Sequence, residues 1–276
     1  SPVTLLAQIH WQGWEVLLDL GFFKLRWYSL MFVVGFWLGF GFMRRCFKAE
    51  GRKVEDLDGL LVALVLGTMI GARLGHVLFY EPARYLADPI SILYIWQGGL
   101  ASHGGAIGCA LAIWLYCRRH PDQPFLWLLD RLVVPVAFTG ALIRVGNFFN
   151  SEILGTPSDL PWAVVFSGAK GVPEALRRTP LHPAQLYESL AYLVTWLVLR
   201  WRYAGPDRDR RGYLSGLFFL LVFGARFGIE FVKLRQVEGA DEWPLSMGQL
   251  LSIPVVLLGL WLVLRARRGA GTTAGA

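Results

Sequence analysis

The chain has 276 residues, of which 55% are hydrophobic and only 17% are charged. Soluble domains carry roughly 25% charged residues, and apolar runs of about 20 residues indicate helices that cross a membrane. This composition excludes an ordinary soluble domain and predicts an integral membrane protein. The net charge of +7 falls in short basic clusters between apolar runs, a pattern of membrane topology that argues against nucleic acid as a partner.

The apolar runs predict an all-α polytopic membrane protein with seven transmembrane helices. The first 25 residues contain Glu15 and Asp19, so we expect no cleavable signal peptide there. We expect the whole chain, residues 1–276, to form one integral membrane domain. The predicted spans are Leu25–Met43, Leu60–Phe79, Ile92–Cys117, Phe125–Arg144, His182–Leu199, Tyr213–Lys233 and Leu245–Leu264.

Basic residues in the loops predict the orientation of the spans. The first, third and fifth loops are basic, whereas the second contains only Arg84. The sixth loop has Glu238, Asp241 and Glu242 beside Lys233 and Arg235. Because Lys and Arg are enriched in cytoplasmic loops, we expect the N-terminus outside and the C-terminus in the cytoplasm.

The segment between the fourth and fifth spans differs from the other loops. Residues 147–181 are interrupted by Gly, Pro and Ser and contain "WAVVF", which predicts a short strand. Loops of this length in a compact protein are usually functional. We therefore expect a small functional insert on the outer face.

Several charged side chains lie inside predicted spans, where their cost marks functional sites. With a rise of ~1.5 Å per residue and a hydrocarbon core of ~30 Å, they fall in the outer half of the membrane. Arginine forks suit phosphate, so we expect an anionic lipid head group as the ligand. The residues are Arg73, Arg144, Glu188, Arg226 and Glu230, with His76 and His103 beside them.

These charges would equally serve to lock helices together by pairing with one another, an alternative that stays open for Arg73 and Glu188. Arg226 and Glu230 are four residues apart on one helix face, so they can pair. Arg144 faces Asn147 if its helix continues, with Glu152 just beyond.

Asp130, beside Arg131 near the predicted inner boundary, is expected to be an interfacial residue.

The stretch "QGGLASHGGAIG" (Gln97–Gly108) places His103 between two glycine pairs. Glycine pairs allow a helix to break, and backbone N–H groups exposed at a break can bind an anion. An imidazole, with an ordinary pKa of ~6.5, can accept a proton near neutral pH. Tight helix packing with a backbone-bonded histidine is the structural alternative. The predicted depth of His103, level with the arginines, favours catalysis.

Seven stretches resemble motifs of the prolipoprotein diacylglyceryl transferase family, and they follow one another along the chain in the family's order. The most specific is "RVGNFFNSEILGTPSD" (Arg144–Asp159). One departure is Lys233, which stands where arginine is usual and lacks the planar fork. The other six stretches are "RWYSLMF" (Arg26–Phe32), "GARLGHVLFY" (Gly71–Tyr80), "GGLASHGGAIG" (Gly98–Gly108), "HPAQLYE" (His182–Glu188), "GARFGIEFVK" (Gly224–Lys233) and "SMGQLLSIP" (Ser246–Pro254).

The resemblance implies a reaction at the outer face of the bacterial cytoplasmic (inner) membrane. The family transfers the diacylglyceryl group of phosphatidylglycerol to the lipobox cysteine of a prolipoprotein, still joined to its signal peptide. A thioether forms and glycerol phosphate leaves. The implied partners are these two substrates and the surrounding membrane lipids, with no metal, cofactor or nucleic acid.

The resemblance also implies roles for particular residues. His103 is the predicted general base, with phosphate donation as the alternative, and Arg144 and Arg226 are predicted to stabilise the leaving oxygen. Arg144 would also bind the lipid phosphate. The other predicted substrate-binding residues are Tyr28, Gly98, Gly99, Gly104, Asn147, Glu152, Gly155 and Glu230. The alternative function is an anionic-lipid transporter or flippase, which usually has paired broken helices, whereas only one break is predicted here.

Overall fold

A computed structural model of the chain describes residues 9–21, 24–95, 98–234 and 245–271. These residues form two compact units. The first unit contains the residues up to Phe42 together with those from Asp130 onward, and the second is Met43–Leu129. The acidic part of the predicted sixth loop, Glu238, Asp241 and Glu242, lies outside the described residues.

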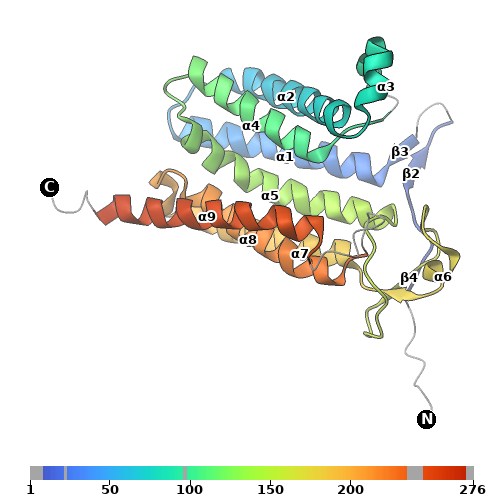
Figure 1. Cartoon of the computed structure of the whole chain (residues 1–276). Coiled ribbons are helices and arrows are strands. Elements are labelled where there is room, and N and C mark those ends of the chain that lie inside the picture. Colours follow the sequence, from blue (N-terminus) through green and yellow to red (C-terminus); the bar gives the residue numbers. More distant parts are fainter. Residues whose placement is uncertain (1–8, 22–23, 96–97, 235–244, 272–276) are drawn as a thin grey trace. The chain divides into compact units, whose positions relative to one another are not determined.

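Long helices dominate both units, as Figure 1 shows. Among the described residues, five of these helices (α1, α2, α5, α8 with its continuation, and α9) are long and apolar enough to cross a membrane. This confirms a polytopic helical membrane protein, while the count of seven spans stays a prediction. The helices are α1 (Trp27–Ala49), α2 (Asp56–Phe79), α4 (Ser102–Arg119), α5 (Phe125–Phe149), α7 (Ala184–Ala204), α8 (Tyr213–Ile229) and α9 (Met247–Gly271).

In the second unit, glycines bring α2 and α4 into close contact, and the two helices lie side by side in Figure 1. A Cβ atom added at Gly71 would lie 2.7 Å from Cα of Gly108, and one at Gly75 would lie 2.8 Å from Cα of Gly104. Small residues at such positions let helix backbones approach within a membrane. Helix packing through glycine, one of the alternatives for the glycine-rich stretch, is therefore present.

The predicted span Ile92–Cys117 is not a single helix. The chain instead forms the short helices α3 (Pro82–Ala87) and η1 (Pro89–Leu93), and α4 begins only at Ser102. Gly98 and Gly99 have φ angles of +88° and +74°, a left-handed conformation that cannot continue a right-handed helix. The break that the glycines predicted thus lies immediately before α4.

In the first unit, the segment that follows α5 contains short strands, one of which pairs with a strand near the N-terminus. The predicted strand in "WAVVF" is confirmed as β4, which pairs in parallel with β1 and antiparallel with β5. Leu154, Phe166 and Leu181 form a buried apolar core for this segment. The elements are β1 (Ile9–Trp11), β2 (Val16–Asp19), β3 (Lys24–Arg26), β4 (Val164–Phe166), α6 (Glu174–Arg177) and β5 (Pro180–Leu181), with β2 and β3 forming an antiparallel pair.

The remaining helices of this unit are α7, α8 and α9, and two short helices, η3 (Pro206–Asp209) and η4 (Glu230–Val232), precede and follow α8. Asp130 holds the beginning of α8. Its carboxylate accepts hydrogen bonds from the Gly212 amide (2.6 Å) and from the amide (2.8 Å) and hydroxyl (2.6 Å) of Ser215. The Asp130 side chain is fully buried and caps this helix, while its place near the inner membrane boundary stays a prediction.

Candidate functional site

The carboxyl end of α5 aligns the first group of candidate residues. The predicted continuation of this helix is confirmed, since α5 runs to Phe149 and Arg144 therefore faces Asn147. The Nη1 atom of Arg144 donates to Oδ1 of Asn147 at 3.1 Å, and Nδ2 of Asn147 donates to Oε2 of Glu152 at 3.0 Å. Two hydrogen bonds at the end of α5 thus connect Arg144 to Asn147 and Asn147 to Glu152.

Glu188, on α7, extends this arrangement into a chain of alternating charges. Its Oε2 lies 2.8 Å from Nε of Arg144, and its Oε1 lies 3.3 Å from Nζ of Lys233. The same Lys233 ammonium lies 3.2 Å from Oε2 of Glu230. We call Arg144, Glu188, Lys233 and Glu230 the ionic network. Glu188 is fully buried, which a carboxylate tolerates because cations lie on both of its oxygens.

Arg226 does not form the expected pair with Glu230, whose carboxylate contacts Lys233 instead. Across the described residues, the half-buried Arg226 side chain has no ion pair. The four charges of the ionic network balance one another. Arg226, one helical turn before Glu230, therefore adds a positive charge without a carboxylate partner in the described chain.

Backbone packing around Gly155 holds Lys233 in place. Gly155 and Lys233 form an isolated antiparallel bridge, and the Gly155 amide donates to the His182 carbonyl at 3.1 Å. A Cβ atom at Gly155 would lie 2.8 Å from the carbonyl oxygen of Val232. A glycine is therefore required here by packing, and direct contact of Gly155 with a lipid stays a prediction.

Two further contacts border the same residues. Tyr28, in the first turn of α1, lies against α5, where a Cβ atom at Gly146 would be 3.0 Å from the Tyr28 ring. At the other end, a Cβ atom at Gly248 would be 2.7 Å from the Glu230 carboxylate. Tyr28 thus lies beside the helix that carries Arg144, and Gly248 borders Glu230 of the network; the binding roles of Tyr28 and Glu230 stay predictions.

His103 belongs to the second unit and lies in the first turn of α4. Its side chain is exposed, and its ring packs against those of Phe79 and Tyr80 at centroid distances of 5.9 and 5.8 Å. In the part of the chain that the structure describes, no side chain caps this helix at Ala101, so its first amides are available to an anion. Gly104, also a predicted binding residue, packs against α2.

Besides Glu188, for which helix locking stayed open, four residues of this site were not predicted as binding or catalytic. Tyr192 lies under Arg144, with the guanidinium carbon 5.9 Å from its ring centroid, and Lys233 joins the carboxylates of Glu188 and Glu230. Asn150 donates to Oε1 of Glu152 at 3.2 Å, and Gln185 donates to the Glu152 carbonyl at 2.5 Å. Apart from Tyr192, all of them lie inside the quoted motifs, so the motifs contained this signal.

Fold and site together define a polytopic helical membrane protein that carries an ionic network around the buried Glu188, at the end of a long apolar helix. The sequence profile of the prolipoprotein diacylglyceryl transferase family matches residues 15–265. The chain therefore belongs to the prolipoprotein diacylglyceryl transferase family.

Curated relatives agree with this assignment over nearly their whole length. A protein of Tolumonas auensis is 47% identical over 256 residues, which cover 93% of this chain and 96% of that protein. Proteins of Chloroherpeton thalassium and Porphyromonas gingivalis are 41% and 42% identical, with 96% of each chain covered. All three are named phosphatidylglycerol–prolipoprotein diacylglyceryl transferase.

Proposed function

We propose that this chain is a phosphatidylglycerol–prolipoprotein diacylglyceryl transferase. It moves the diacylglyceryl group onto the lipobox cysteine of a prolipoprotein and releases glycerol phosphate. Family membership supports this activity. The observation in the structure that carries it is the ionic network around Arg144, together with Arg226 on α8, which has no ion pair among the described residues. Nothing in the comparisons favours the transporter alternative.

The charge change of the reaction explains why a cationic site would accelerate it. The cysteine sulfur attacks the carbon of the diacylglyceryl group that bears the phosphate. A carbon–sulfur bond forms, and the bond from that carbon to the phosphate oxygen breaks. The electron pair of the broken bond stays on that oxygen, and the phosphate goes from one negative charge to two. Cationic donors therefore bind the transition state more strongly than the intact lipid, which is the condition for catalysis.

The two arginines would contribute differently. Arg144 is fixed by Glu188 and Asn147, so its remaining surface can bind the lipid phosphate with little loss of side-chain freedom. Arg226 has no ion pair among the described residues, and its guanidinium is free to face the oxygen that leaves. Glu230, Glu152 and Asn147 would orient these cations or bind the glycerol head group, beside Tyr28.

His103 is the proposed general base. A free thiol has a pKa of ~8.5 and is mostly protonated at neutral pH, so the attacking sulfur needs a proton acceptor. The exposed His103 ring has no side-chain hydrogen bond within the described chain. The uncapped amides of the same helical turn can bind an oxyanion, with Gly98 and Gly99 directly before them. Donation from His103 to the phosphate is the second possible role.

We further infer seven spans, with α4 and α7 added to the five apolar helices, in the bacterial inner membrane. The N-terminus and residues 147–181 would be outside and the C-terminus in the cytoplasm. Single cysteines at the exposed positions Lys170 and Arg208, in a chain without its own cysteines, test this. An impermeant maleimide should label Lys170→Cys in spheroplasts and Arg208→Cys only after lysis. The reverse pattern would overturn the orientation.

The transfer activity is tested with purified protein in lipid nanodiscs, phosphatidylglycerol and a fluorescent lipobox peptide. Wild type should form the thioether peptide. Arg144→Ala should reduce kcat by roughly 10²–10³-fold, the usual cost of one oxyanion donor. His103→Gln should reduce it by roughly 10²–10⁴-fold.

Matched controls are Arg178→Ala and His10→Gln, which replace exposed side chains of the same types and should leave the rate unchanged. Full thioether formation by both site variants would rule out these assignments. Transbilayer movement of labelled phosphatidylglycerol by wild type, without any thioether, would instead support the transporter.

A further inference from the structure

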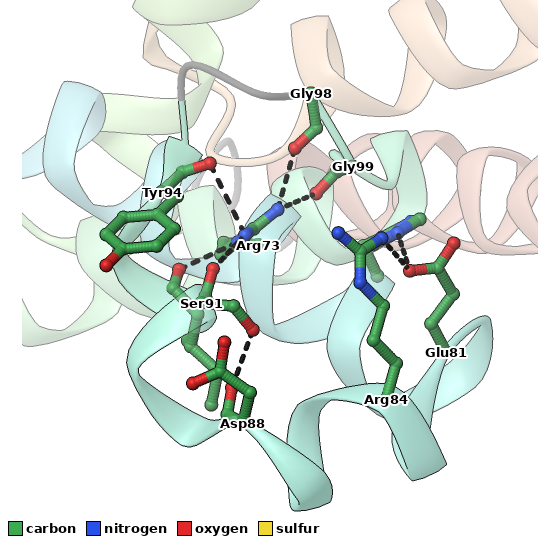
Figure 2. Close-up of polar contacts among 10 residues, drawn as sticks. Arg73, Glu81, Arg84, Asp88, Ser91, Tyr94, Gly98 and Gly99 are labelled. Atoms are coloured by element: carbon green, nitrogen blue, oxygen red, sulfur yellow. Dashed lines mark hydrogen bonds and ion pairs between the residues drawn. The ribbon is translucent and has the colours of Figure 1, made fainter.

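Arg73, on α2, is a buried arginine whose partners are backbone carbonyls. Its side chain is only 5% exposed, and Figure 2 shows its guanidinium surrounded by carbonyl oxygens. Its Nε donates to the carbonyl oxygen of Ile92 at 2.8 Å, and its Nη2 donates to those of Ser91 at 2.6 Å and Tyr94 at 3.5 Å. Its Nη1 donates to the carbonyl oxygens of Gly98 at 2.7 Å and Gly99 at 3.1 Å.

These contacts argue against the ion-pair lock left open by the sequence for Arg73. Within the described residues, Arg73 contacts no carboxylate. The nearby Glu81 is bonded to Arg84 at 2.7 Å and lies 3.9 Å from His76. The positive charge of Arg73 is therefore stabilised by the dipoles of backbone carbonyls at a helix end and a turn.

The five carbonyls come from two separate pieces of chain. Ser91, Ile92 and Tyr94 belong to η1 and its end, whereas Gly98 and Gly99 form the left-handed turn just before α4. One planar guanidinium bonds to both pieces at once. Lysine cannot reproduce this, because its donors share a single nitrogen while those of arginine spread over a fixed fork.

The same turn is fitted closely against α2. A Cβ atom at Gly99 would lie 2.7 Å from Cδ2 of His76 and 2.8 Å from Nη1 of Arg73. Two residues later, the Ala101 amide donates to the Ala72 carbonyl at 2.9 Å, and α4 starts directly afterwards. The position of the first turn of α4 therefore depends on the turn that Arg73 binds.

A continuous series of ring contacts leads from Arg73 to His103. The guanidinium carbon lies 5.0 Å from the Tyr85 ring centroid, and Tyr85 contacts His76 edge-on at 6.1 Å. His76 stacks on Tyr80 at 5.4 Å, and Tyr80 contacts His103 at 5.8 Å. Backbone and rings thus both connect the buried arginine to the exposed histidine.

We propose that Arg73 is a positioning residue of the transfer reaction, which holds the Gly98–Gly99 turn so that His103 and the first amides of α4 are preorganised. This inference rests on the proposed catalytic role of His103. It assigns no contact between Arg73 and the substrates.

The main test compares Arg73→Lys with Arg84→Lys in nanodiscs. Both arginines lie over the Tyr85 ring, but Arg84 is exposed and bonds only to Glu81 among the described residues. Arg73→Lys should accelerate amide hydrogen exchange in residues 98–105 by roughly tenfold or more, with the rest of α2 unchanged. It should lower kcat by roughly 10²-fold, the cost of a small misplacement, and leave KM within about twofold. Arg84→Lys should match wild type in both measurements.

A second variant reaches the same contact from the other side. Gly99→Ala places a methyl group against Arg73 and His76, whereas Gly51→Ala also introduces alanine at a positive φ (+66°) but has no atom within 4 Å. Gly99→Ala should reproduce the local exchange and the loss of kcat, and Gly51→Ala should not. This pair keeps the test valid if Arg73→Lys fails to fold.

The outcomes separate this inference from the proposed function. Unchanged exchange in residues 98–105, or equal acceleration throughout α2 and α4, would overturn the positioning role and leave the function standing. Wild-type transfer by His103→Gln would overturn the catalytic assignment and with it the link between Arg73 and kcat, although local exchange would still test the turn itself.

Discussion

Glu188→Gln perturbs the ionic network with the smallest change of shape. The two oxygens of Glu188 contact different cations, Arg144 Nε at 2.8 Å and Lys233 Nζ at 3.3 Å. The glutamine amide has one oxygen and one NH₂ group, so in either orientation a donor faces one of the cations. Rotation of the side chain cannot repair both contacts.

The expected magnitude follows from the burial of this carboxylate. Breaking a buried ion pair by removing one partner costs ~3–5 kcal/mol. We expect about 3 kcal/mol for glutamine, which keeps one acceptor. At roughly 2 °C per kcal/mol for a chain of this size, the melting temperature should fall by about 6 °C. Because Arg144 loses its fixed orientation, kcat should also fall by roughly 10- to 100-fold.

The assay combines thermal unfolding in detergent with the thioether assay in nanodiscs. Glu174→Gln is the matched control, since Glu174 forms an exposed pair with Arg178 and such pairs contribute little to stability. The control should resemble wild type in both assays. A Glu188→Gln variant with unchanged melting temperature and unchanged kcat would refute the idea that the network fixes Arg144.

Three further predictions concern the same two units. Lys233→Arg should keep kcat within about threefold because a fork can contact both carboxylates, whereas Lys233→Met should lower kcat at least roughly tenfold; equal rates of the two variants would contradict this. Asp130→Asn should lower the free energy of unfolding by ~1–3 kcal/mol at unchanged KM, because the NH₂ group of asparagine would face a hydrogen-bond donor of Gly212 or Ser215. Equal melting temperatures of this variant and wild type would count against the cap. Gly71→Ala should destabilise by ~1–3 kcal/mol through overpacking against α4, while Gly59→Ala, with open space around it, should be neutral or stabilising; similar melting curves would disprove close packing at Gly71.

Run length and spacing predicted the features that depend on nearby residues. The long helices, the strand in "WAVVF" and the alignment of Arg144 with Asn147 all follow from helix or strand periodicity and are confirmed. The glycine pair also indicated a break. Its exact place was not predictable, because hydropathy continues across Ile92–Cys117 and only the left-handed glycines end that pattern.

Partners that are distant in the sequence could not be predicted from spacing. The i, i+4 rule suggested Glu230 for Arg226, but Glu230 contacts Lys233, and a carboxylate from another helix, Glu188, holds Arg144. Arg73 bonds to backbone carbonyls. Because every residue has such a carbonyl, the residue types do not show which of them accept. The capping role of Asp130 likewise depends on how the chain returns to it.

The central claim is that sulfur displaces phosphate at carbon while cationic side chains stabilise the departing oxygen. The most direct measurement uses phosphatidylglycerol with a heavy oxygen isotope in the bridge between the diacylglyceryl carbon and phosphorus. Mass spectrometry of the wild-type reaction should find the label in the released glycerol phosphate, in equal amount to the unlabelled thioether peptide. Unlabelled glycerol phosphate, with the heavy oxygen retained on the lipid product, would contradict the claim.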